Sequence, residues 1–381
     1  MCKPQFTKWV IFSAFIFWAA TALGDEPYRY PEARHGKGEL KYVNSIPVLV
    51  VQGSPEEIGD QMGVLALKPA FQLVKLADAV VKERGWERIY PLLLKTGNLM
   101  VAQFPRDHLK ELDAAAKSSS WDRDLLIFAN TIPDLRKLGG CSTLFVDAEH
   151  SATGGPLFGR NLDWSPVGPL TDYTLVAVYR PEGKRAFASI TYPGMVGCFS
   201  AINEAGLALA DLTVNSAADG SVPLDPAGVP YTLALRRVME ECTTIEEAEK
   251  LLRSLRRSTM QNVAICDRKQ GAVFEITTKS LAVRRSAAGF CACTNHFRSK
   301  ELATSMSCDR FAKLETSREI QTFNVAHLSK QLDLVHQGSW TLQTMVFEPA
   351  SLKLHLAFGK GPATRLPLRA VELADYFAKD R

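Results

Sequence analysis

The chain has 381 residues, of which 46% are hydrophobic and 23% are charged, and its formal net charge at pH 7 is +4. A charge this small gives no reason to expect nucleic acid or an anionic membrane as a partner. The length is enough to bury a large core, in one large domain or two ordinary ones.

The first 24 residues have the pattern of an export signal. Lys3 and Lys8 precede an apolar run, and the small residues Ala22 and Gly24 stand just before Asp25. This pattern predicts a cleaved signal peptide over residues 1–24 and a periplasmic or extracellular location. The run is short for a membrane span, so an uncleaved anchor is the alternative. We expect no integral membrane segment after the signal is cleaved.

Residues 25–140 are predicted to form a prosegment that is mostly helical after a short strand at 46–52. Ser54 is the expected N-cap of its first helix, with Pro55 in the first turn and Glu57 completing a capping box. Pro69 is expected to bend or interrupt that helix. Further helices are predicted over residues 71–84, 105–117 and 121–138.

The motif Gly139-Gly140-Cys141-Ser142-Thr143 begins the most informative stretch. The apolar runs on either side of residues 147–155 predict a hairpin, which brings Arg160 and Asp163 back beside Cys141. Two glycines before a cysteine permit a sharply turned, strained peptide bond, because glycine adopts backbone angles closed to other residues.

These residue types suit a chain that cuts itself before Cys141 and then attacks amides. A nearby guanidinium such as Arg160 lowers the pKa of a thiol and favours the nucleophilic thiolate. A free α-amine, with a pKa of about 7.7–8.0, can accept the thiol proton and return it to a leaving amine. Asp163 could hold the resulting ammonium. The alternative is a buried structural cysteine beside an Arg–Asp pair.

After Asp163 the sequence predicts strands, then two helices, then more strands. This order implies antiparallel sheets with helices on their outer faces. The strands are expected at residues 173–179, 186–192, 197–202, 207–214, 262–266, 272–277, 281–285, 340–349 and 352–359, and the helices at 232–241 and 245–255.

Cys141 together with Arg160-Asn161-Leu162-Asp163 resembles the N-terminal-nucleophile cysteine hydrolases. That group includes the acyl-coenzyme A:6-aminopenicillanic acid acyltransferase family, which is related to choloylglycine hydrolase and acid ceramidase. The stretch from Gly53 to Gly63 resembles the opening of that family's prosegment. The resemblance implies an α+β fold, a four-layer αββα sandwich with its catalytic core in residues 141–381. It also implies self-cleavage between Gly140 and Cys141, with the two resulting chains staying associated. Whether these chains form a higher oligomer is left open.

Two later elements extend the resemblance. Thr294-Asn295 resembles a family element whose Asn side chain lines the oxyanion hole. Asp309-Arg310-Phe311 resembles another element, whose Arg side chain reaches the surroundings of the nucleophile. A second oxyanion Asn of the bile salt hydrolases corresponds here to Thr213, and Asn215 is the possible substitute. His296 invites a Cys–His interpretation, but adjacent strand residues point to opposite faces.

Six other cysteines follow Cys141, and their spacing matches no zinc pattern. An exported protein can form disulfides among these cysteines, but their spacing does not determine which of them pair. For Cys291 and Cys293 we favour two small core residues over a strained bridge or a metal site. We expect neither a metal nor a cofactor.

The predicted function is therefore hydrolysis of a linear, non-peptide amide, or transfer of its acyl group, through a Cys141 thioester. The expected substrate is a small N-acyl amide, with acyl-coenzyme A as a further candidate donor. One alternative is a true amine acyltransferase of the penicillin type. The other is an uncleaved, non-catalytic scaffold protein.

Overall fold

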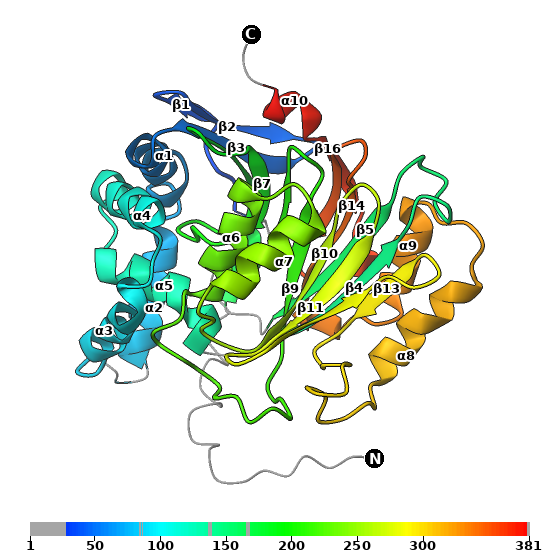
Figure 1. Ribbon diagram of the computed structural model, residues 1–381. Coiled ribbons are helices and arrows are strands. Elements are labelled where there is room, and N and C mark those ends of the chain that lie inside the picture. The colour runs from blue at the N-terminus through cyan, green and yellow to red at the C-terminus, as the bar shows by residue number, and fades with distance from the viewer. Residues whose placement is uncertain (1–27, 84, 86, 136–138, 165–167, 379–381) are drawn as a thin grey trace.

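Two β-sheets lie face to face between two layers of helices (Figure 1). The computed structural model describes residues 28–378 apart from 84, 86, 136–138 and 165–167, so the predicted signal peptide lies outside the described residues. Three apolar cores separate the four layers. The α+β, four-layer αββα architecture predicted from the sequence is confirmed.

The larger sheet has ten strands in the order β1-β2-β3-β6-β7-β8-β9-β10-β11-β12. All neighbouring strands are antiparallel except β3 and β6, which run parallel. The strands are β1 Ala33–His35, β2 Gly38–Val43, β3 Ile46–Gly53, β6 Leu175–Pro181, β7 Phe187–Thr191, β8 Ser200–Asn203, β9 Ala208–Thr213, β10 Gln261–Cys266, β11 Gly271–Ile276 and β12 Leu281–Arg285.

The smaller sheet has six strands in the order β13-β4-β5-β14-β15-β16. Its central hairpin, β4–β5, is the predicted one. The strands are β4 Gly139–Val146, β5 Leu157–Trp164, β13 Phe290–Cys293, β14 Thr341–Glu348, β15 Lys353–Phe358 and β16 Arg369–Glu372.

Helices α1, α4, α5, α6 and α7 pack on the outer face of the larger sheet, and α8 and α9 on that of the smaller sheet (Figure 1). The helices are α1 Pro55–Met62, α2 Gln72–Glu83, α3 Tyr90–Val101, α4 Arg106–Ser119, α5 Arg123–Leu135, α6 Tyr231–Glu241, α7 Ile245–Ser254, α8 Asp309–Glu315, α9 Val325–Asp333 and α10 Ala374–Phe377. No helix of the described part of the chain is long and apolar enough to cross a membrane.

The segment before residue 141 is built into this fold. The predicted capping box is present, with Ser54 and Glu57 exchanging hydrogen bonds at the start of α1. Beyond the expected helices, the segment adds β1 and β2, and its strand β3 pairs with β6. Arg236 of α6 holds Glu111 of α4 through two hydrogen bonds, of 2.8 and 2.6 Å, and both side chains are buried.

Candidate active site

The β4–β5 hairpin places the predicted residues around Cys141. Its register sets Gly140 opposite Asp163 and Cys141 opposite Leu162. Cys141 is 2% exposed and Arg160 and Asp163 are fully buried. Chain reversal thus brings together side chains that lie about twenty residues apart in the sequence.

Arg160 reaches the Cys141 thiol and the larger sheet at the same time. Its Nη2 atom lies 3.6 Å from Cys141 Sγ and 3.3 Å from Asp211 Oδ1. Its Nη1 atom donates to the carbonyl oxygens of Asp211, at 2.6 Å, and of Phe199, at 3.3 Å. Arg160 therefore has the predicted place, but its positive charge is shared with a buried carboxylate.

Burial raises the pKa of the Cys141 thiol to about 12 in the uncleaved chain. Arg160 lowers this pKa, whereas the carboxylates of Asp211 and Asp163 raise it further. The guanidinium thus acts in the predicted direction, but desolvation outweighs it. Around neutral pH the thiol of the uncleaved chain is protonated.

The backbone of Cys141 is held by the two late motifs. Its N–H donates to Asn295 Oδ1 at 2.7 Å, and its carbonyl oxygen accepts from Arg310 Nη1 at 2.9 Å. Arg310 Nη2 also donates to Asn295 Oδ1, at 2.9 Å, and Asn295 Nδ2 donates to the Thr213 carbonyl at 2.8 Å. Two donors face Oδ1 and one acceptor faces Nδ2, which fixes the orientation of this amide. Nδ2 has a second hydrogen, so Asn295 can donate to an oxyanion while it stays bonded to Thr213.

Asp163 is held by the segment before β14. Its carboxylate accepts from Thr341 Oγ1 at 2.5 Å and from Gln337 Nε2 at 3.0 Å, and Arg310 Nη1 lies 3.9 Å away. Burial raises the pKa of the Asp163 carboxyl, and the hydrogen bonds from Thr341 and Gln337 oppose that rise. Asp163 lies opposite Gly140 on the neighbouring strand, beside the predicted cleavage position.

Gln337 is a site residue that the sequence did not reveal. A Cβ atom at Gly140 would collide with its Nε2 atom. Gly140 itself pairs regularly with Asp163 and has no positive φ. The suggestion that glycine supplies unusual backbone angles here is therefore not supported for Gly140, whose missing Cβ instead leaves room for the Gln337 amide.

The two tentative oxyanion residues differ in position. Thr213 ends β9, and its carbonyl accepts from Asn295. Asn215 lies beyond the end of β9 and is exposed. We find no hydrogen bond between Asn215 and the described site residues, so the structure brings only Thr213 to Asn295.

His296 contacts Cys308. Burial raises the pKa of Cys308, but hydrogen bonds with His296 and Thr294 outweigh it and lower the pKa to about 6. The side chain of His296 thus interacts with the thiol of Cys308, and a Cys141–His296 pair is not formed. Cys291 and Cys293 are buried, unbridged core residues, as expected. Among the described residues no cluster of metal-ligating side chains is found.

Asp211 and Tyr231 are further residues that the sequence analysis missed. Asp211 is 2% exposed, and Tyr231 Oη donates to its Oδ2 atom at 3.0 Å. Burial raises the pKa of Asp211, and Arg160 and Tyr231 oppose that rise. The one available signal was a lone carboxylate in the otherwise apolar stretch from Leu207 to Leu212.

An apolar cluster stands beside these polar groups. It consists of Tyr192, Met195 and Phe199, with Trp164 and Leu170 packed against it. The rings of Trp164 and Phe199 lie 6.1 Å apart, edge to face. Since Trp164 follows Asp163 and Phe199 binds Arg160, the cluster is continuous with the surroundings of Cys141.

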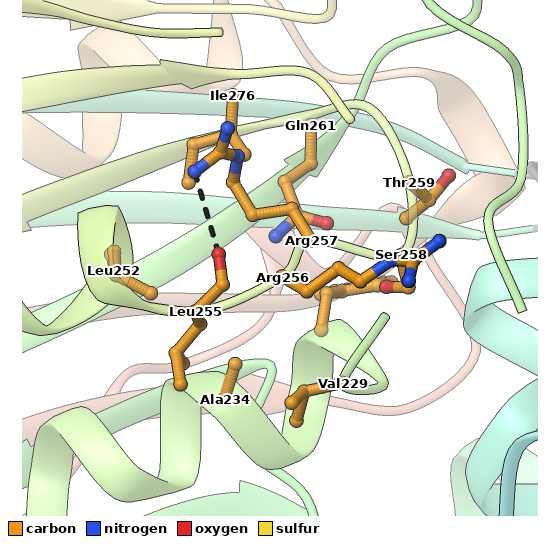
Figure 2. A pocket seen from close by; sticks show the side chains of 11 residues that line it. Val229, Ala234, Leu252, Leu255, Arg256, Arg257, Ser258, Thr259, Gln261 and Ile276 are labelled. Atoms are coloured by element: carbon orange, nitrogen blue, oxygen red, sulfur yellow. Dashed lines mark hydrogen bonds between the residues drawn. The ribbon is translucent and has the colours of Figure 1, made fainter. Parts of the chain in front are cut away.

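A separate hollow lies between α6, α7 and the adjoining strands (Figure 2). Arg257 crosses it, with Nη1 3.5 Å from the Leu255 carbonyl oxygen. Tyr231 also lines it, but Cys141, Arg160 and Asn295 do not. We therefore assign it no part in the candidate active site.

The family model for acyl-coenzyme A:6-aminopenicillanic acid acyl-transferase matches residues 151–362, which is 212 of 381 residues. The chain belongs to this family. The matched region contains Arg160, Asp163, Asn295 and Arg310, and it begins ten residues after Cys141. Membership places the chain in a family described by acyl transfer.

Three solved structures are similar to this chain at low identity. The Caenorhabditis elegans N-acylethanolamine-hydrolyzing acid amidase ortholog is 16% identical, covers 55% of this chain and 93% of its own, and has a TM-score of 0.44. A mutant conjugated bile acid hydrolase from Clostridium perfringens is 14% identical, covers 62% of this chain and 93% of its own, and has a TM-score of 0.44. Penicillin V acylase from Agrobacterium tumefaciens is 15% identical, covers 58% of this chain and 84% of its own, and has a TM-score of 0.43. No curated protein is significantly similar in sequence.

Proposed function

We propose that this acyltransferase-family chain cleaves itself between Gly140 and Cys141 and then acts as an N-terminal-cysteine amidase. The observation that carries the proposal is the convergence of three elements on one residue. Arg160 binds the thiol of Cys141, Asn295 its N–H and Arg310 its carbonyl. A merely structural cysteine has no need for all three.

In the self-cleavage step, Cys141 Sγ attacks the carbonyl carbon of Gly140, and the thiol proton passes to the leaving nitrogen of Cys141. A thioester joins the two parts until water attacks it, which releases the Gly140 carboxylate and a free Cys141. Breaking the Gly140–Cys141 bond opens the thiol to solvent. Because desolvation is the main cause of the high thiol pKa, that pKa falls on cleavage.

In amide turnover the freed α-amine accepts the thiol proton while Sγ attacks the substrate carbonyl. The amine, held 2.7 Å from Asn295 Oδ1 in the uncleaved chain, then returns the proton to the leaving amine as the C–N bond breaks. The acyl group remains on sulfur as a thioester. Water completes hydrolysis, whereas a second amine completes acyl transfer. Acyl-coenzyme A would enter as another thioester-forming donor.

The apolar cluster supports a substrate with an apolar acyl group. Tyr192, Met195 and Phe199 provide aromatic and thioether groups packed against Trp164, the residue after Asp163, and each buried methylene of an acyl chain contributes about 0.8 kcal/mol. We also propose export through residues 1–24, which N-terminal sequencing of the mature protein would test. The two cleaved chains are expected to stay associated through β3–β6 and Glu111–Arg236.

Trapping the thioester tests the proposed function. Purified protein is mixed with N-acyl amino acids, penicillins, conjugated bile acids or N-acylethanolamines, quenched in acid and analysed by peptide mass spectrometry. We expect an acyl adduct on Cys141 with at least one class, and none in Cys141→Ala. Release of amine without any adduct on Cys141 would contradict the mechanism, and an inert, uncleaved chain would favour a scaffold.

A further inference from the structure

The loop between β7 and β8, residues 192–199, serves both halves of the candidate site. Its last residue, Phe199, accepts a hydrogen bond from Arg160 Nη1 at 3.3 Å through its carbonyl. Its residues Tyr192, Met195 and Phe199 also form the apolar cluster. A displacement of this loop would therefore move the apolar wall and one acceptor of the guanidinium together.

One buried side chain from before the scissile bond holds this loop. Asn130 of α5 is fully buried, and its Nδ2 atom donates to the Gly194 carbonyl at 2.7 Å. Its Oδ1 atom accepts from the N–H groups of Val196, at 2.8 Å, and Gly197, at 3.4 Å. The second Nδ2 hydrogen goes to the Leu126 carbonyl at 2.9 Å. All four hydrogen-bonding positions of the amide are used.

Two glycines let the loop lie this close to the helices. Gly194 has a φ of +84°, and a Cβ there would come within 2.8 Å of Leu126 of α5. A Cβ at Gly197 would overlap Thr232 of α6. Arg236 adds a hydrogen bond of 3.0 Å from Nη1 to the Val196 carbonyl. The loop is thus fitted to both the segment before Cys141 and the segment after it.

We propose that Asn130 is a positioning residue that sets the acyl-group preference of the enzyme, so that the chain preceding Cys141 remains part of the site after cleavage. This inference rests on the proposed amidase function. Asn130 itself touches no reacting atom. It acts by fixing Met195 and Phe199 against Trp164, where a bulky apolar acyl group would lie.

The test compares Asn130→Leu with Asn203→Leu, a matched control. Asn203 is also fully buried and pins a turn through four hydrogen bonds, to Met239, Cys242, Ala205 and Leu207. For Asn130→Leu we expect the ratio of kcat/KM for a bulky acyl amide to that for the acetyl amide to fall about 10-fold, mainly through KM, because uniform binding is lost. Asn203→Leu should keep the parent ratio.

Asn130→Asp provides a conservative rescue if Asn130→Leu folds poorly. A protonated carboxyl at position 130 would still donate to Gly194 and accept from Val196, whereas the ionised form would face two carbonyls without a donor. The bulky-to-acetyl ratio of this variant should approach that of the parent at acid pH and fall as pH rises. A ratio unchanged at every pH, in both Asn130 variants, would overturn the inference.

Hydrogen exchange separates this inference from the proposed function. Asn130→Leu should speed exchange in the peptide spanning residues 192–199, and Asn203→Leu should not. A parent protein that turns over no amide refutes the amidase, while the exchange data still decide whether Asn130 clamps the loop. Active parent enzyme with an unmoved loop and an unmoved acyl preference in Asn130→Leu refutes the clamp alone.

Discussion

Replacing Gly140 with alanine tests how the proposed cleavage position is shaped. The new Cβ would collide with Gln337 Nε2 and lie 2.9 Å from its Cδ, so the amide must move away from Asp163, to which it donates at 3.0 Å. A hydrogen bond to a charged group contributes about 1.5–3 kcal/mol. If that whole loss falls on self-cleavage, Gly140→Ala should slow it about 10- to 150-fold.

The assay follows the fragment beginning at residue 141 by intact-mass spectrometry during cell-free synthesis. Gln337→Ala and the double variant complete a double-mutant cycle. If the collision is the cause, the double variant should be about as slow as Gln337→Ala alone. Additive losses would show that Gln337 does not transmit the effect of Gly140→Ala. Parent-rate cleavage by Gly140→Ala would refute the reasoning altogether.

Three further predictions concern other parts of the site and the fold. Cys308, whose thiol has a pKa of about 6, would compete for iodoacetamide, so the first test uses cleaved protein that carries Cys308→Ser. In this background Arg160→Gln should shift the alkylation of Cys141 to higher pH. An unshifted pH profile would show that Arg160 does not stabilise the Cys141 thiolate. Asn295→Ala should cut kcat on the order of 10²–10³-fold with a smaller change in KM, and an unchanged kcat would exclude it as a transition-state donor. Glu111→Gln removes one of the two buried carboxylates that pair with Arg236 and leaves Glu240, at 2.8 Å. It should lower the free energy of unfolding by about 1.5–3 kcal/mol in urea titration, whereas a loss below about 0.5 kcal/mol would deny the Glu111–Arg236 pair a structural role.

Local patterns in the sequence predicted the parts of the fold and site that local chemistry decides. The hairpin turn was sufficient to place Arg160 and Asp163 beside Cys141, and the capping box marked the start of α1. The order of strands and helices indicated two sheets with outer helices. Pro69 does lie in the break between α1 and α2, although a π-helical stretch at Gly63–Leu67 comes first.

The residues that the sequence did not reveal depend on contacts between distant segments. Gln337 is 174 residues from Asp163, and Asn130 is 66 residues from Val196. Asn and Gln occur in many turns and helices, so nothing local distinguishes these two. Helix α3 and strands β1 and β2 were also missed. β1 is only three residues long and largely exposed, which leaves little apolar alternation to detect.

The mass of the purified protein tests the central claim most directly. Intact-mass and N-terminal analysis of the parent should give a fragment that begins at Cys141 and ends at the C-terminus, together with the associated N-terminal chain. Cys141→Ala should remain a folded, uncut chain without amidase activity. A parent protein that stays whole, or a Cys141→Ala variant that still splits at this position, would contradict self-cleavage by Cys141.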